Sequence, residues 1–268
     1  MNRINNSFSR LKEEGKKALI PFITAGDPHP SMTVSLMHAL VDAGADMIEL
    51  GVPFSDPMSD GPVIQHASER ALKFGTSLKD ILVMVAEFRK KDDATPVILM
   101  GYLNPFEAMG YEKFALDAKQ AGVDGVLTVD CPPEEGGKLL DAFSREGITP
   151  IFLLSPTTSM ARMEKIGKYA SGYVYYVSLK GVTGATHLDF SEIEEKVGEI
   201  RKVIDIPVCI GFGIRDEATA RAASQIADGI VIGSRIVKEM ESADRESAAK
   251  NVSSFLSAIR KAIDEEKR

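Results

Sequence analysis

Eight short and nearly continuous apolar runs alternate with longer amphipathic segments along this chain of 268 residues. Strands that are apolar on both faces are typical of a parallel sheet covered by helices on each side. Eight β/α units within roughly 250 residues are what a (β/α)8 TIM barrel requires, and we predict that fold. A doubly wound open sheet is the alternative, although about six or seven strands would be more usual for it. The predicted strands are Leu19–Ile23, Asp46–Leu50, Val97–Met100, Gly125–Thr128, Thr149–Leu153, Tyr173–Ser178, Val208–Ile210 and Gly229–Ile232.

The amphipathic segments between these runs predict the helices that surround the barrel. An extra helix over Ser7–Lys12 precedes the first strand, and we expect it to cover the bottom of the barrel. The chain has no linker, low-complexity segment or change of composition, so we expect one (β/α)8 barrel domain over residues 1–268. The predicted helices are Ser31–Ala43, Val63–Phe74, Ser77–Lys90, Pro105–Ala121, Glu134–Arg145, Ser159–Tyr169, Ser191–Val203, Glu217–Ala223, Arg235–Met240 and Arg245–Lys261.

A near-repeat supports the barrel. Ala43–Asp46, Ala121–Gly125 and Ala227–Gly229 each precede a predicted strand. In each of them a small residue is placed to end a helix, and an aspartate enters the strand.

Composition limits the classes of function. A net charge of −7 without any basic block argues against a nucleic-acid surface, and no apolar stretch approaches the 18 residues of a membrane span. The N-terminus has no apolar secretion signal. Cys131 and Cys209 lie far apart, which favours free thiols in a reducing compartment and a cytoplasmic protein. The four histidines have no ligand spacing, and we predict no metal.

The segment Glu49–Pro62 carries the strongest sign of chemistry. Glu49 closes a buried strand, where a carboxylate is costly unless something there needs it. The loop that follows is fixed by prolines and glycines and carries Asp60. In a (β/α)8 barrel the active site lies at the C-terminal face of the strands. Two carboxyl groups on different supports can therefore face one cavity with different pKa values, as acid/base chemistry requires.

Glycine-containing loops at the same face predict a phosphate site. Gly213 follows the seventh predicted strand, and Gly233 with Ser234 follows the eighth and opens a helix. Barrels often bind phosphate there, because bare backbone N–H groups and a helix dipole favour an anion. Gly184, after the sixth strand, can complete the cup. No Walker-type lysine pattern is present, so we expect a phosphate monoester held by neutral donors.

Four segments together resemble the tryptophan synthase alpha family, in its order and at its spacing, over essentially the whole chain. They are Pro21–Pro28, Glu49–Pro62, Gly181–Gly184 and Gly211–Ile214. The resemblance implies cleavage of indole-3-glycerol phosphate to indole and glyceraldehyde 3-phosphate. It assigns the acid/base role to Glu49 and stabilisation of the indole nitrogen to Asp60.

The resemblance also implies how the substrate is bound. Thr183, Gly184, Gly213, Gly233 and Ser234 would hold the phosphate end. The indole ring would lie in an apolar slot, and Tyr175 is a third candidate for catalysis. The residues expected to line the slot are Phe22, Met100, Leu127 and Phe212, with Met100 standing where the family often has leucine.

Plainer interpretations compete with these roles. Asp60 can instead cap the helix that begins near Val63, and Tyr175 can be a wall of the pocket. A Schiff-base aldolase using Lys180 is a rival enzyme, although that lysine lies past its strand in a loop. A non-catalytic regulatory subunit is a rival of another class, and retention of both Glu49 and Asp60 speaks against it.

Loop residues without a catalytic duty suggest a partner surface. Aromatic residues and prolines at loop tips near an active site are more typical of an interface than of a solvated rim. The resemblance implies a PLP-dependent beta subunit that docks there in an α2β2 assembly and receives indole, with no cofactor in this chain. The expected interface residues are Asp56, Tyr102, Asn104, Pro105, Phe106 and Pro132.

Overall fold

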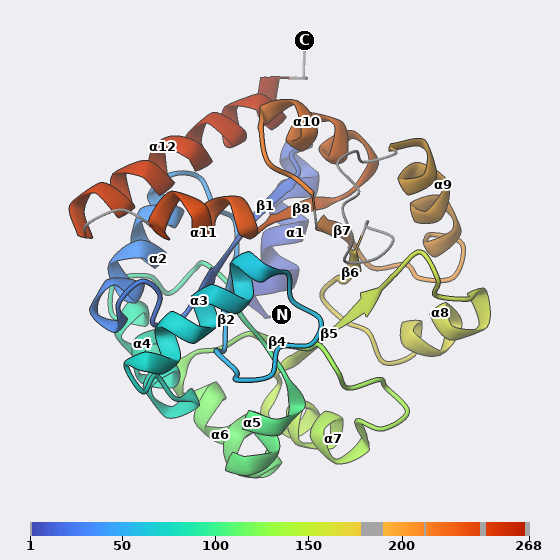
Figure 1. Ribbon diagram of the computed structural model, residues 1–268. Coiled ribbons are helices and arrows are strands. Elements are labelled where there is room, and N and C mark those ends of the chain that lie inside the picture. The colour runs from blue at the N-terminus through green and yellow to red at the C-terminus, as the bar shows by residue number, and fades with distance from the viewer. Residues whose placement is uncertain (1, 178–189, 212, 242–244, 266–268) are drawn as a thin grey trace.

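Eight parallel strands form a closed barrel in the computed structural model, which describes residues 2–177, 190–211, 213–241 and 245–265 (Figure 1). Each strand pairs with the next along the chain, and β8 pairs with β1. The predicted TIM barrel is therefore confirmed, and the open sheet is excluded. The strands are β1 (Ala18–Thr24), β2 (Ile48–Gly51), β3 (Val97–Gly101), β4 (Gly125–Thr128), β5 (Thr149–Leu154), β6 (Val174–Val177), β7 (Val208–Gly211) and β8 (Gly229–Ile232).

Helices surround the barrel on its outer side (Figure 1). The predicted single helix Pro105–Ala121 is wrong, because the backbone breaks at Gly110, whose φ of 88° no helix accommodates. None of the helices in the described ranges is long and apolar enough to cross a membrane. The helices are α1 (Arg3–Glu14), η1 (Pro30–Met32), α2 (Thr33–Asp42), α3 (Pro62–Lys73), α4 (Leu78–Arg89), α5 (Leu103–Met109), α6 (Tyr111–Ala121), α7 (Gly137–Glu146), α8 (Met160–Gly167), α9 (Phe190–Ile200), α10 (Glu217–Ile226), α11 (Ser234–Glu241) and α12 (Arg245–Asp264).

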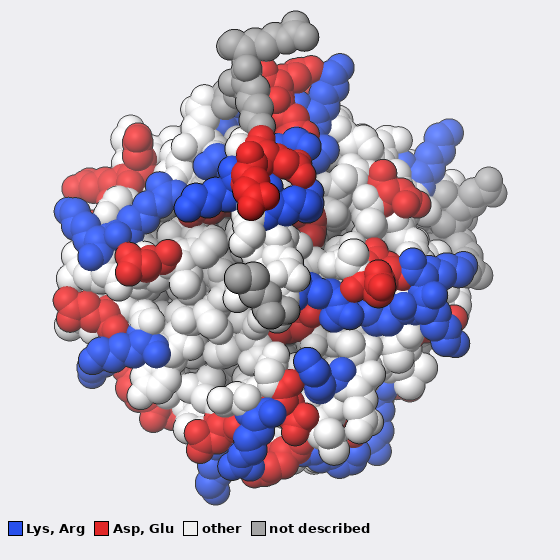
Figure 2. Space-filling model, turned by 180° about the vertical axis from the view of Figure 1, so that it is seen from behind, with Lys and Arg blue, Asp and Glu red and all other residues white. Residues whose placement is uncertain are grey.

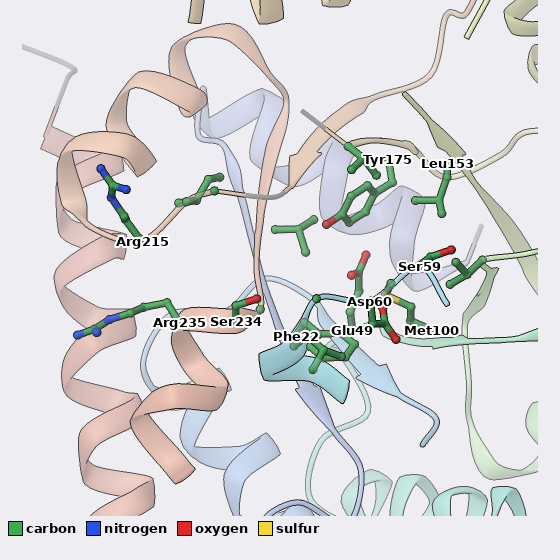
Figure 3. Close-up of a pocket in the computed structure, with 18 of the residues that line it drawn as sticks. Phe22, Glu49, Ser59, Asp60, Met100, Leu153, Tyr175, Arg215, Ser234 and Arg235 are labelled. Atoms are coloured by element: carbon green, nitrogen blue, oxygen red, sulfur yellow. The ribbon is translucent and has the colours of Figure 1, made fainter. Parts of the chain in front are cut away.

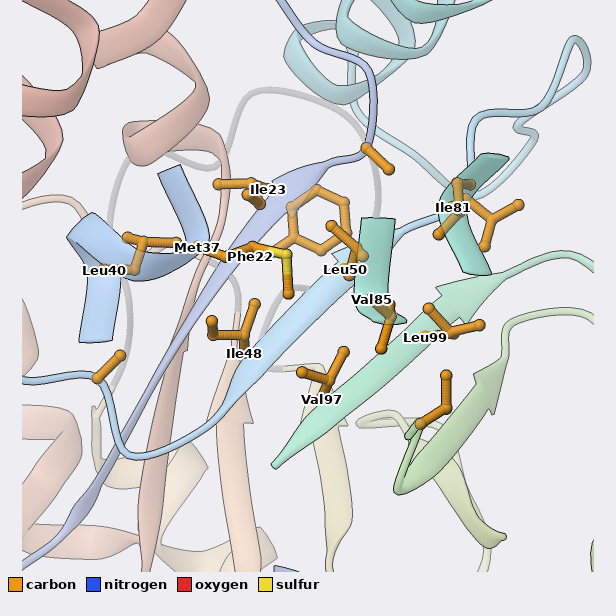
Figure 4. Close-up of a cluster of buried hydrophobic side chains, with 14 of the residues drawn as sticks. Phe22, Ile23, Met37, Leu40, Ile48, Leu50, Ile81, Val85, Val97 and Leu99 are labelled. Atoms are coloured by element: carbon orange, nitrogen blue, oxygen red, sulfur yellow. The ribbon is translucent and has the colours of Figure 1, made fainter. Parts of the chain in front are cut away.

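The outer faces of the strands pack against these helices. Figure 4 shows this layer where β1, β2 and β3 meet α2 and α4. The side chains there are fully buried, and each contributes about 1.5–3 kcal/mol relative to an exposed position. They include Ile23, Met37, Leu40, Ile48, Leu50, Ile81, Val85, Val97 and Leu99.

Helix α1 closes the end of the barrel at which the strands begin, as the sequence predicted. Its buried side chains Ile4, Phe8 and Leu11 join the cluster that fills the barrel interior. Arg3 at its first turn pairs with Asp124, the residue before β4, at 2.9 Å. The barrel is therefore sealed at this end, and only the opposite end is left open for a cavity.

The three aspartates of the near-repeat act as clips between neighbouring strands at this sealed end. Each carboxylate accepts a hydrogen bond from a backbone N–H at or near the start of the preceding strand in the barrel, so a donor that strand pairing leaves free is satisfied. These bonds run from Leu19 N to Asp46 (3.0 Å), from Val97 N to Asp124 (2.9 Å) and from Val208 N to Asp228 (2.9 Å).

Each of these aspartates is also paired with an arginine, which lies on a helix or, for Arg201, directly after one. The ion pairs are Arg260–Asp46 (2.9 Å), Arg89–Asp124 (2.7 Å) and Arg201–Asp228 (3.1 Å). Through the bond to a backbone N–H each aspartate joins two neighbouring strands, and through the ion pair it joins the barrel to the surrounding helices. Figure 2, which views the molecule from behind, shows Lys and Arg side chains interspersed with Asp and Glu over this face.

We predict that Asp124→Ala destabilises the fold by about 3–5 kcal/mol, because it takes the closest carboxylate from the half-buried Arg89 and the hydrogen-bond acceptor from the Val97 N–H. Asp124 is 5% exposed and accepts bonds from Arg3, Arg89 and Val97 N. Urea denaturation measures the change in unfolding free energy.

The matched control is Asp117→Ala. Asp117 pairs with Lys113 on the surface of α6, where the two side chains are 30% and 59% exposed. Such a pair contributes about 0–1 kcal/mol. Equal losses in the two variants would mean that the clip has no special place in the barrel.

Candidate active site

A cavity of about 610 Å³ opens at the C-terminal ends of the strands (Figure 3). Eight of the predicted site residues line it together, from β1, β2, β3, β6 and three loops. They are Phe22, Glu49, Asp60, Met100, Tyr175, Gly213, Gly233 and Ser234. Residues as far apart in the chain as Phe22 and Ser234 therefore converge on one site, at the face where the barrel fold predicts it.

Glu49 projects from β2 into the barrel interior and is fully buried. The phenol of Tyr173 donates a hydrogen bond of 2.6 Å to its Oε1, while Oε2 is buried without a hydrogen-bond partner among the described residues. Burial raises the pKa of Glu49 to about 7, and the bond from Tyr173 opposes that rise. Near neutral pH this carboxyl can therefore both donate and accept a proton.

Asp60 reaches the same cavity from the loop between β2 and α3 (Figure 3). Burial raises its pKa to about 6, and a hydrogen bond from the Tyr102 phenol opposes the rise. The Tyr102 oxygen also accepts a bond of 3.0 Å from the Ser59 N–H, so it holds both the loop and the carboxylate. The capping alternative is wrong, because α3 begins after Gly61 with no side-chain cap.

The two carboxyl groups consequently differ in pKa, which lets one stay ionised while the other exchanges a proton. At pH 7 to 7.5, a pKa of about 6 leaves Asp60 mostly ionised, whereas a pKa of about 7 leaves Glu49 shared between its two forms. One group supplies a fixed negative charge, and the other can exchange a proton with a bound molecule.

Two glycines at strand ends make room for the aromatic walls of the cavity. A Cβ on Gly211 of β7 would lie 1.8 Å from the Tyr175 hydroxyl oxygen, and one on Gly51 of β2 would lie 2.5 Å from the Phe22 ring. Neither ring could hold its place beside a larger residue. Tyr175 and Phe22 therefore owe their positions in the cavity to neighbouring strands.

One predicted wall residue is misplaced. Leu127 is fully buried in the interior cluster that α1 covers, and it does not line the cavity. Val129, two residues further along the same strand direction, lines it instead. Because side chains alternate along a strand, Leu127 and Val129 both point into the barrel, but Leu127 lies further from the cavity, in the interior cluster. The same alternation could have identified Val129, and it could have singled out Tyr173, which precedes Tyr175 by two.

The end of the cavity where the sequence predicts a phosphate site combines the predicted glycines with charged side chains that the sequence analysis did not identify. Gly213 has a φ of 80°, and Gly233 and Ser234 lie at the N-terminus of α11. Arg215, Arg235 and Lys238 line this end as well. The sequence could have indicated Lys238, because it follows the predicted site residue Ser234 by one helical turn.

Several predicted residues fall outside the described part of the chain. They are Thr183, Gly184 and Phe212 of the substrate site and Lys180 of the rival aldolase. Within the described part, no group of three or more His, Cys, Asp or Glu side chains is placed to hold a metal ion.

Only some of the residues expected to form the partner surface are exposed. Tyr102 is 3% exposed and Phe106 is fully buried, so neither can present itself to a partner, and both predictions are wrong. Their rings pack inside the chain, against Phe54 and Phe114. Asp56 and Asn104 are exposed, and Pro105 and Pro132 are half-buried. Met58, which the sequence reasoning passed over, is 81% exposed on the Asp60 loop.

Comparison with known proteins places this site in a family. The family model described as tryptophan synthase alpha chain matches residues 8–264. A tryptophan synthase alpha chain from Chromobacterium violaceum is 59% identical over 263 residues, which cover 98% of this chain and all of the relative. One from Nitrosospira multiformis is 58% identical over 264 residues, with 98% and 95% covered.

Solved structures agree with the sequence relatives. The alpha subunit of tryptophan synthase from Legionella pneumophila superposes with a TM-score of 0.92 at 45% identity, covering 99% of each chain. A chain of tryptophan synthase from M. tuberculosis superposes with a TM-score of 0.88 at 30% identity, covering 98% of this chain and all of that one. The barrel, its two cavity carboxyl groups and these full-length matches establish that this chain belongs to the tryptophan synthase alpha chain family.

Proposed function

We propose that Glu49 and Asp60 divide between them the chemistry of the family's reaction, the cleavage of indole-3-glycerol phosphate to indole and glyceraldehyde 3-phosphate. This carbon–carbon lyase reaction is a retro-aldol cleavage. The observation that carries the assignment is the buried Glu49 carboxyl with a pKa of about 7, which lies with Asp60 in one cavity.

The reaction needs two proton transfers that cancel. Protonated Glu49 donates its proton to carbon three of the indole ring, and positive charge spreads to the ring nitrogen. The Glu49 carboxylate then removes the proton from the side-chain hydroxyl. The O–H electrons form the aldehyde C=O bond, and the electrons of the breaking carbon–carbon bond restore the aromatic ring. Glu49 ends in the protonated form in which it began.

Asp60 stabilises the charge that develops between these two steps. A carboxylate beside the ring N–H lowers the energy of the cationic intermediate more than that of the neutral substrate, which is what accelerates a reaction. Its pKa of about 6 keeps it ionised at neutral pH, and the bond from Tyr102 holds it in place. Tyr175 lies beside both groups in the cavity and would border the scissile bond.

The remaining walls suit the two ends of the substrate. Phe22 and Met100 offer apolar surface for the indole ring, together with Val129, Leu153 and Ile64. Backbone donors at Gly213, Gly233 and Ser234 would bind the phosphate at the start of α11. Thr183, Gly184 and Phe212 are assigned to the substrate by the resemblance alone.

Membership of an alpha chain family implies a beta-subunit partner. We assign the docking surface to the exposed loop residues Asp56 and Met58 and to the exposed Asn104 of α5, with Pro105 and Pro132 as further members. The assembly we propose is an α2β2 heterotetramer in which the beta subunit, and not this chain, holds PLP. We further propose that the whole chain acts as one domain in the cytoplasm, in keeping with its free Cys131 and Cys209 thiols.

Glu49→Gln is expected to lower indole release by about 10²–10⁴-fold, because an amide keeps the shape and the bond to Tyr173 but cannot exchange a proton. Binding of glycerol 3-phosphate, measured by calorimetry, should stay close to that of the unmodified protein. Glu69→Gln, at an exposed position of α3, is the control and should leave turnover unchanged. Retention of about a tenth of the activity by the Glu49 variant would rule it out as the acid/base group.

The pH dependence of kcat/KM should be bell-shaped, rising as Asp60 ionises near pH 6 and falling as Glu49 loses its proton near pH 7. The hydrogen bond from Tyr173 lowers the pKa of Glu49, so Tyr173→Phe should move the falling limb to higher pH. A shift of about 0.5–1 pH unit corresponds to one ordinary hydrogen bond.

Tyr176→Phe is the control for that shift. Tyr176 lies in β6, three residues after Tyr173, but belongs to the outer cluster between β6 and α9. Its removal should leave both limbs in place. Ionisation of the substrate phosphate contributes to the rising limb in every variant, and therefore the falling limb decides the test.

Asn104→Asp is expected to lower activation by a beta subunit more than it lowers the activity of the isolated chain. It adds a charge to an exposed residue of the proposed docking surface and leaves the cavity unchanged. Indole release is measured with and without the partner. Gln120→Glu, exposed on α6 near the sealed end of the barrel, is the charge-matched control. Equal losses in both assays would remove Asn104 from the interface.

A further inference from the structure

We infer that Lys238 is a specificity-determining residue that recognises the negative charge of the substrate's phosphate group at the rim of the cavity. The inference rests on the proposed function, since it concerns the phosphate end of the same site. It goes beyond the expectation of neutral donors alone.

Three cationic side chains line this end of the cavity, and two of them are already occupied. The Arg235 guanidinium pairs with Glu239 at 2.5 Å and lies 5.4 Å from the centre of the Phe255 ring on α12. Arg215 contacts Asp216 at 3.6 Å. Figure 3 shows both arginine side chains extending away from Glu49 and Asp60.

Lys238 differs from the two arginines. It lines the cavity, it is exposed, and its side chain forms no ion pair and no hydrogen bond with any residue of the described ranges. A lysine ammonium offers three donors and a full positive charge. Of the rim cations, it is therefore the one whose charge is not already matched by a described acidic neighbour.

Helix geometry directs this charge to the proposed phosphate site. Lys238 follows Ser234 by four residues in α11, so the two side chains share one face of the helix. Side chains in an α-helix lean toward its N-terminus and cover the preceding turn, which rises about 5.4 Å. The Val237 N–H bonds the Gly233 carbonyl at 3.1 Å and fixes that turn. This spacing puts the turn that starts with Gly233 and Ser234 within reach of the Lys238 ammonium group.

The charge is needed because the inner part of the cavity carries acids of its own. Glu49 and Asp60 line it, Asp216 at the rim is matched by Arg215, and a phosphate monoester brings about −1.5 to −2 further charges at neutral pH. The N-terminus of a helix offers only about half a positive charge, and backbone donors carry none. One unpaired ammonium at the rim supplies the larger part of the compensation.

A charge series on the full-length chain tests this inference. Calorimetric affinity for glycerol 3-phosphate should be about equal for the unmodified protein and Lys238→Arg, about tenfold weaker for Lys238→Met, and weaker still for Lys238→Glu. The difference between Lys238→Met and the unmodified protein should shrink at high ionic strength. KM for indole-3-glycerol phosphate should follow the same order, with kcat nearly unchanged and affinity for indole, which has no phosphate, unaffected.

Lys250→Met is the matched control, because it removes a positive charge from an exposed position of α12 outside the cavity. It should bind glycerol 3-phosphate like the unmodified protein. If Lys238→Met and Lys238→Glu also bind it like the unmodified protein while indole release continues, the inference is wrong and the proposed function stands. If the unmodified protein binds no phosphate ester and releases no indole, the proposed function fails and the inference with it.

Discussion

Pairing of β8 with β1 is the contact on which the rest of this structure depends, since it closes the sheet and leaves no edge. The seam brings Gly229 opposite Ala18, where a Cβ on the glycine would come within 2.9 Å of the Ala18 Cβ and 2.8 Å of the Cys209 sulfur. A larger residue there would force the seam apart. Because the barrel closes, its interior becomes a separate compartment with only two ends.

One end of the barrel interior is closed, and the other opens into the cavity. At the beginning of the strands, α1 fills the opening and the aspartate clips tie strands to one another. At the other end the interior residues give way to a cavity, so a single strand passes from core to site along its length. Tyr173, immediately before β6, lies in the core beside Glu49, and two residues later Tyr175 of β6 lines the cavity. Neighbouring residues along one strand direction can therefore serve the core and the cavity respectively.

The sequence predicted best those features that follow a regular pattern or a long specific motif. The apolar runs located all eight strands to within about two residues at either end, and the Glu49–Pro62 segment located both cavity carboxyl groups. Depth inside the barrel was harder, because Leu127 and Val129 share one inward-facing pattern and differ only in their layer. Burial by other parts of the chain was harder still. Tyr102 reads as a loop-tip aromatic residue, yet Phe54 and the Asp60 loop cover it. The role of Arg235 and Lys238 in α11 could not be predicted from the sequence, because it depends on which acidic side chains pair with each of them in the folded chain.

Burial of the Glu49 carboxyl, with only one hydrogen bond to it, has a consequence for the stability of the fold. In the unfolded chain this group titrates near pH 4.5, whereas in the folded chain its pKa is about 7. Between these values the folded state holds the extra proton, so folding stability falls as pH rises and the full cost is reached above pH 7. The shift corresponds to about 3 kcal/mol, a large part of the stability of an ordinary domain. A neutral side chain of the same shape would not carry that cost. Selection for thermal resistance alone, at neutral or alkaline pH, would therefore tend to discard the group that the reaction needs, and only selection for turnover keeps it in the barrel.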